Sequence, residues 1–101
     1  MWILQSSWPE GDAFTFRLRT GAVKTVGRAT RADFVVDAAL VSRVHCRLTA
    51  GNDHVELVDL SSTNGTFVND KRVTKAQLSS GDRLRIGRVE FRLDKEEPKQ
   101  T

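Results

Sequence analysis

Three short stretches of this 101-residue chain gather side chains that donate hydrogen bonds. They are residues 27–31 (GRATR), 40–45 (LVSRVH) and 61–64 (SSTN). Together they hold Arg28, Arg31, Ser42, Arg43, His45, Ser62, Thr63 and Asn64, and they contain no acid. Guanidinium, hydroxyl, imidazole and carboxamide groups without a carboxylate suit the binding of an anion, and phosphate is the candidate.

A phosphorylated side chain carries about −1.5 to −2 charge and three acceptor oxygens, so its site needs one fixed cation and several neutral donors. Arg28 suits the first role because its planar fork can donate two parallel bonds. It follows Gly27, which permits close backbone approach, at the end of a strand expected over 24–26. Ser42 is expected to donate both its hydroxyl and its backbone N–H, and Arg43 adds a second charge. The residues alone leave open that Arg28 is a solvated surface arginine and Ser42 an ordinary turn residue.

The remaining polar residues have a structural interpretation as well as a binding one. His45 is expected to brace the loops rather than touch a ligand. Asn64 can donate and accept, as a grip on a peptide main chain requires, but turn chemistry explains Asn64-Gly65 equally, since both tolerate the left-handed region. A nucleophilic Ser42–His45 pair is not supported. A separation of three residues on an extended chain tends to send the two side chains to opposite faces, and no Gly-x-Ser-x-Gly elbow surrounds the serine. Catalysis would also need a carboxylate to orient the histidine.

The elements that must position these loops are strands. Apolar and polar residues alternate over 14–18, 44–48, 83–86 and 89–93, which predicts half-buried strands, and no sustained helical period appears. Asn69-Asp70 predicts a two-residue hairpin with positive φ, and Gly87-Arg88 predicts a type II′ turn with glycine first. Many short strands with frequent turns predict an all-β sandwich or barrel over residues 1–94. Residues 95–101 are charged and interrupted by proline, so they are expected to form a tail or linker.

Composition narrows the function further. Sixteen Lys and Arg against thirteen Asp and Glu give a net charge of +3, which favours anionic partners without identifying one. The single cysteine, Cys46, excludes an internal disulfide and a cysteine-built metal site, and it is expected in the core.

A cytoplasmic location is expected, or a nuclear one in a eukaryote, because the chain shows neither a signal peptide nor ~20 consecutive apolar residues. No phosphate-loop, dinucleotide or metal motif appears, so no cofactor and no enzymatic activity are expected.

Gly27-Arg28, Ser42-Arg43-Val44-His45 and Ser62-Thr63-Asn64-Gly65-Thr66, in this order and spacing, resemble the forkhead-associated (FHA) domain. The resemblance implies an eleven-stranded sandwich of two twisted, mostly antiparallel sheets, with loops at one end that bind phosphothreonine peptides in kinase signalling. It implies that Arg28 and Ser42 contact the phosphate, with Thr63 beside them and Arg43 adding a contact. Asn64 would then bond the peptide backbone. His45, Gly27 and Gly65 would support the loops.

The resemblance also bears on specificity. Two residues before Ser42, some members have a basic side chain that reads an acid three residues after the phosphothreonine, and here that residue is Leu40. No strong demand for an acid is therefore expected, although Arg31 or Lys71 could restore one.

The expected partner is a phosphothreonine-containing protein or peptide, bound by a monomeric domain that can be part of a larger protein. No membrane or nucleic-acid partner is expected, because acids interrupt the basic residues. The alternative is a phosphate-independent interaction or dimerisation module of the same fold that uses an exposed sheet face.

Overall fold

The computed structural model describes residues 1–8 and 14–96. Those residues form strands, turns and loops, with no helix among them. The strands are β1 (Trp2–Trp8), β2 (Thr15–Leu18), β3 (Val23–Gly27), β4 (Phe34–Val35), β5 (Cys46–Ala50), β6 (Val55–Asp59), β7 (Thr66–Val68), β8 (Lys71–Val73), β9 (Lys75–Leu78), β10 (Arg83–Ile86) and β11 (Val89–Lys95). The prediction of an all-β domain with eleven strands is confirmed.

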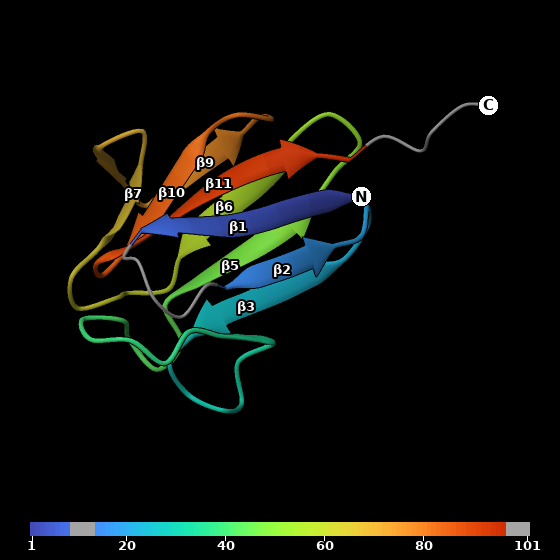
Figure 1. The fold of residues 1–101 in the computed structure, drawn as a ribbon. Coiled ribbons are helices and arrows are strands. Elements are labelled where there is room, and N and C mark those ends of the chain that lie inside the picture. Colours follow the sequence, from blue (N-terminus) through green and yellow to red (C-terminus); the bar gives the residue numbers. More distant parts are fainter. Residues whose placement is uncertain (9–13, 97–101) are drawn as a thin grey trace.

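Two sheets pack face to face. One has six strands in the order β2-β1-β11-β10-β7-β8, and the other has five in the order β4-β3-β5-β6-β9. Neighbouring strands are antiparallel, except that β4 pairs parallel with β3. Figure 1 shows the loops over 28–45 (teal to green) and 60–65 (yellow-green) at one end of the sandwich, away from the N-terminus and from the end of β11. The sheets therefore hold the three polar stretches at a common end.

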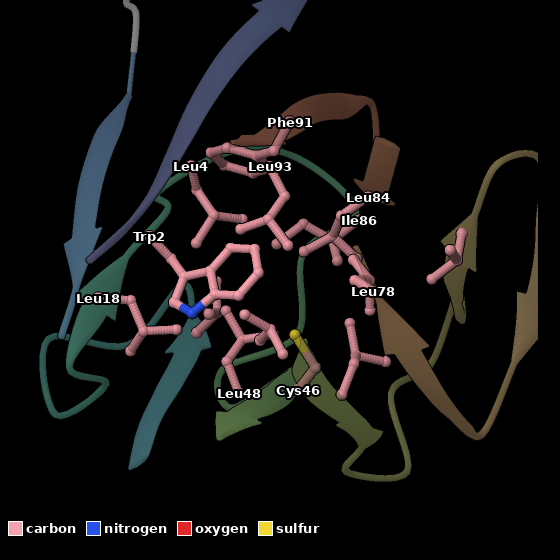
Figure 2. Close-up of a cluster of buried hydrophobic side chains, with 14 of the residues drawn as sticks. Trp2, Leu4, Leu18, Cys46, Leu48, Leu78, Leu84, Ile86, Phe91 and Leu93 are labelled. Atoms are coloured by element: carbon pink, nitrogen blue, oxygen red, sulfur yellow. The ribbon is translucent and has the colours of Figure 1, made fainter. Parts of the chain in front are cut away.

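The core lies between the sheets and follows from the period of two. In β5, Cys46, Leu48 and Ala50 are buried while Arg47 is exposed. Figure 2 shows the Trp2 indole among the leucines of both sheets, and its Nε1–H donates to the Gly51 carbonyl at 3.0 Å. Burial, together with the Asp59 carboxylate, raises the pKa of the Cys46 thiol to about 12. The expectation that Cys46 belongs to the core is confirmed.

Both specific turn predictions are confirmed. Asn69 and Asp70 have φ of 49° and 69° and join β7 to β8. Gly87 has φ of 57° and, with Arg88, connects the paired residues Ile86 and Val89, as a type II′ hairpin requires.

The expected strand bounds needed correction at two places. The strand predicted from Val44 begins at Cys46, because the chain bends at residues 43–44. The strand predicted over 89–93 continues to Lys95, whose N–H donates to Ser80 Oγ at 3.0 Å. The rest of the expected tail, 97–101, lies outside the described residues. Nowhere in the described ranges is there a helix long and apolar enough to cross a membrane.

Candidate functional site

The end of β3 and the segment 42–45 are joined by backbone hydrogen bonds. The N–H groups of Arg28 and Ala29 donate to the carbonyls of Ser42 and Arg43 at 2.9 and 3.0 Å. Gly27 makes this approach possible, since a Cβ there would lie 2.9 Å from the Val44 Cα and closer still to the Arg43 carbonyl. A side chain at this position would separate the two segments, and with them Arg28 from Ser42.

His45 links two loops from a fully buried position. Its Nδ1 accepts the Ser42 backbone N–H at 3.0 Å, which places the ring proton on Nε2. Nε2 lies 2.8 Å from the Gly65 carbonyl and donates to it. The bend at 43–44 lets the imidazole reach back to Ser42. The Ser42 backbone N–H, which the sequence offered as a possible donor, is therefore already bonded, and the Ser42 hydroxyl is the donor that remains.

Asp59, at the end of β6, organises the loop that follows it. Its Oδ1 accepts the Ser62 hydroxyl at 2.5 Å and the Thr66 hydroxyl at 2.7 Å, and its Oδ2 accepts the Ser62 N–H at 3.2 Å. Burial alone would raise the pKa of Asp59, but these hydrogen bonds outweigh it and lower the pKa below its ordinary value. Sequence analysis did not identify this role. The signal available for it was an acid three residues before a serine, the spacing of a local side-chain-to-backbone bond.

Two side chains, those of Arg28 and Ser42, lie where the loops converge. Arg28 Nε donates to the Val41 carbonyl at 3.1 Å, which fixes the guanidinium plane. Its two terminal nitrogens make no hydrogen bond or ion pair with any residue that the structure describes. Ser42 Oγ accepts the Thr63 N–H at 3.0 Å and keeps its own proton to donate. Both residues thus present donors with no partner in the described part of the chain.

Asn64 is anchored on the opposite loop. Its Nδ2 donates to the Leu40 carbonyl at 3.0 Å, which leaves its Oδ1 and one N–H for a ligand. Leu40 has φ of 70° and is 47% exposed, and Ser61 has φ of 57°. Left-handed backbone costs a residue with a Cβ about 1–2 kcal/mol, so the loops hold strained backbone on both sides of the site.

A cavity of about 930 Å³ opens between these loops. The structure brings seven of the predicted site residues together on its wall, namely Arg28, Arg31, Leu40, Ser42, Arg43, Thr63 and Asn64. Lys71 lies instead on the edge strand β8. Asp37 is the one acid on a wall with three arginines, and sequence analysis did not identify it. The cavity therefore gathers the positive charge and the hydrogen-bond donors that an anion would need, mainly from residues whose types had predicted such a site.

Comparison with known proteins agrees with this geometry. The family model of the FHA domain matches residues 24–87. The glycogen accumulation regulator GarA of Mycobacterium tuberculosis is 39% identical over 72 residues, which are 71% of this chain and 43% of GarA. The chain thus spans less than half the length of that curated relative.

Two solved structures are similar over nearly the whole chain. The FHA domain of FhaA, in complex with the intracellular domain of Rv3910, has a TM-score of 0.82 and 35% identity, covering 92% of this chain and 99% of that one. A structure from a study of phosphothreonine-dependent FHA domain interactions has a TM-score of 0.82 and 33% identity, covering 96% and 98%.

Proposed function

This chain belongs to the FHA family, and from that premise we propose that its loop end binds phosphothreonine peptides reversibly and without chemistry. One observation carries the proposal. Arg28 is held at Nε by the Val41 carbonyl, with its terminal nitrogens directed to no residue of the described chain, beside the Ser42 hydroxyl in a single cavity. A fixed cation next to a neutral donor is what a phosphate dianion requires.

The contacts follow from the groups that remain unused. The terminal N–H groups of Arg28 donate to two phosphate oxygens, and the Ser42 hydroxyl donates to the third. Arg43 and Arg31, on the same wall, add positive charge. Asn64 offers one donor and one acceptor, which matches the N–H and C=O of a peptide main chain. Leu40, exposed at the same wall, favours an apolar residue after the phosphothreonine over an acid.

Affinity for phosphorylated peptides tests the proposal directly. Fluorescence anisotropy with a degenerate phosphothreonine peptide library should show micromolar-range binding, while the unphosphorylated library does not bind. Arg28→Ala should weaken binding at least tenfold, because each hydrogen bond to a charged group contributes about 1.5–3 kcal/mol. Arg28→Lys keeps the charge but loses the planar fork, and it should recover only part of the affinity.

Arg47→Ala is the matched control, because Arg47 is exposed on β5 and lines no part of the cavity. It should bind as the wild type does. Equal binding of phosphorylated and plain peptides would contradict the proposal, and binding that survives Arg28→Ala would favour a phosphate-independent module. If Arg28→Ala does not fold, as judged by its thermal transition, the arginine is structural and its proposed role is wrong.

A further inference from the structure

The arginines on the outer face of the six-stranded sheet divide into two kinds. Three of the five have an acid partner: Arg17 pairs with Glu96 at 3.1 Å, Arg83 with Asp70 at 3.3 Å, and Arg92 with Asp94 at 3.2 Å. Arg72 on β8 and Arg85 on β10 form no ion pair within 4.0 Å with a described residue. Neither guanidinium is thus held in an ion pair with a described residue, although Glu90, which pairs with Arg83 at 3.7 Å, is the cross-strand neighbour of Arg85.

Arg72 and Arg85 lie on either side of one aromatic ring. Phe67 is the cross-strand partner of both, so the three residues form a row across β8, β7 and β10 on one face. The Arg85 guanidinium carbon lies 4.3 Å from the centre of the Phe67 ring. A cation–π contact fixes the guanidinium without cancelling its charge. The Arg72–Phe67–Arg85 row therefore presents two cations on an ordered apolar support.

This row borders the loop end of the molecule. Phe67 is the second residue of β7, which begins directly after the loop over 61–65. A Cβ on Gly65 would lie 2.7 Å from Arg72 Nε, so the Arg72 side chain lies against the Gly65 backbone. Gly65 is adjacent to Asn64, which lines the cavity. A peptide that leaves the cavity across residues 64–65 meets Arg72 first and the rest of the row next.

We propose that the Arg72–Phe67–Arg85 row is a second binding surface, which takes an acidic segment flanking the phosphothreonine of the same ligand. The inference rests on the proposed function, because it requires the phosphothreonine to be seated in the cavity. An acidic segment suits this row for two reasons. Carboxylates fit the planar forks of the two arginines, and the aliphatic part of a Glu or Asp side chain packs on the Phe67 ring. The other three arginines of this face already form ion pairs, so the acidic side chains of a ligand find at this row arginines that form no ion pair with a described residue.

The test compares phosphothreonine peptide pools that differ only in one flank. A run of glutamates is placed before the degenerate core in one pool and after it in another, and matched pools carry glutamines instead. Wild-type protein should bind one of the two glutamate pools about three- to tenfold more tightly than its glutamine counterpart, as two exposed ion pairs allow. This gain should shrink as salt is raised, because exposed charges are screened.

The double variant Arg72→Gln/Arg85→Gln should lose this gain while it binds the glutamine pools as the wild type does, which also shows that it is folded. Arg83→Gln/Arg92→Gln is the matched control, two arginines of the same face that already have acid partners, and it should keep the gain. The proposal is overturned if no glutamate pool is preferred, or if the preference survives in the double variant. Pools that bind equally with and without the phosphate would instead overturn the proposed function and this inference together.

Discussion

At His45, one buried imidazole satisfies two backbone groups that belong to different loops. It accepts the Ser42 N–H and donates to the Gly65 carbonyl, so the serine proposed to bind phosphate and the loop proposed to bind the peptide are positioned by the same side chain. Because Nδ1 accepts and Nε2 donates, only the neutral ring with its proton on Nε2 makes both bonds. We therefore propose that His45 supports ligand binding through the geometry of the loops and not through direct contact.

Substitution of His45 should therefore damage stability and binding together. His45→Ala leaves a buried N–H and a buried C=O without their partner and creates a cavity, so we expect the free energy of unfolding to fall by about 2–5 kcal/mol. Chemical denaturation measures this change. His54→Ala is the control, because the His54 side chain is only half-buried, and it should cost less than about 1 kcal/mol. A His45→Ala protein as stable as the wild type would show that the two bonds do not hold the loops.

Residue types predicted much of the site, but they did not predict the contacts that depend on backbone conformation. Arg28, Ser42 and Asn64 could be selected because all three side chains donate hydrogen bonds and because their order and spacing resemble the FHA motifs. The loss of the Ser42 N–H to His45 could not be seen, because it depends on the bend at 43–44. The position of Arg72 against Gly65 was hidden for the same reason, since it follows from the pairing of β7 with β8.

At the scale of elements, the loop over 59–66 folds around a charge. The Asp59 carboxylate accepts from the start and the end of this loop, through Ser62 and Thr66, and Ser62 Oγ in turn accepts the Gly65 N–H at 3.0 Å. The shape of the loop therefore depends on the hydrogen bonds that the ionised Asp59 carboxylate accepts.

The pH dependence of this loop follows from the direction of the Asp59 pKa. Its pKa is lowered on folding from the ordinary 3.8, so the ionised carboxylate stabilises the folded loop above the ordinary pKa. That stabilisation should be lost as the pH falls through the lowered value. Amide chemical shifts of Ser62 and Gly65, followed by NMR through an acid titration, should report this step. In Asp59→Asn the step should be absent, and a step that persists there would assign it to another group.

Elements were predictable where the alternation was strong. β5, β10 and β11 carry buried apolar side chains at every second position, and their existence was predicted. β4 has two residues and exists because Phe34 pairs with Val26 on β3, a parallel contact with no local signal. β9 (KAQL) has only Leu78 buried, so its pattern is too weak to identify a strand.

For the whole molecule, the frequency of turns predicted the class of fold but not the order of the sheets. That order rests on pairs that are distant in sequence, such as Trp2 with Lys95 and Val26 with Cys46. The burial of Trp2 by strands from both halves of the chain depends on the same pairs. Local sequence patterns contain no information on such contacts.

The pairing of β1 with β11 also determines how the molecule responds to a pulling force. The Glu96 N–H donates to the Met1 carbonyl at 2.8 Å. At this end of the antiparallel pair β1 begins and β11 ends. Tension between Met1 and Glu96 therefore loads their hydrogen bonds one after another, as in opening a zipper. We expect rupture at a much lower force than for tension between Met1 and Arg88, which loads the bonds of the pair together in shear. Optical-trap measurements with handles at these positions would test this, and equal rupture forces would contradict it.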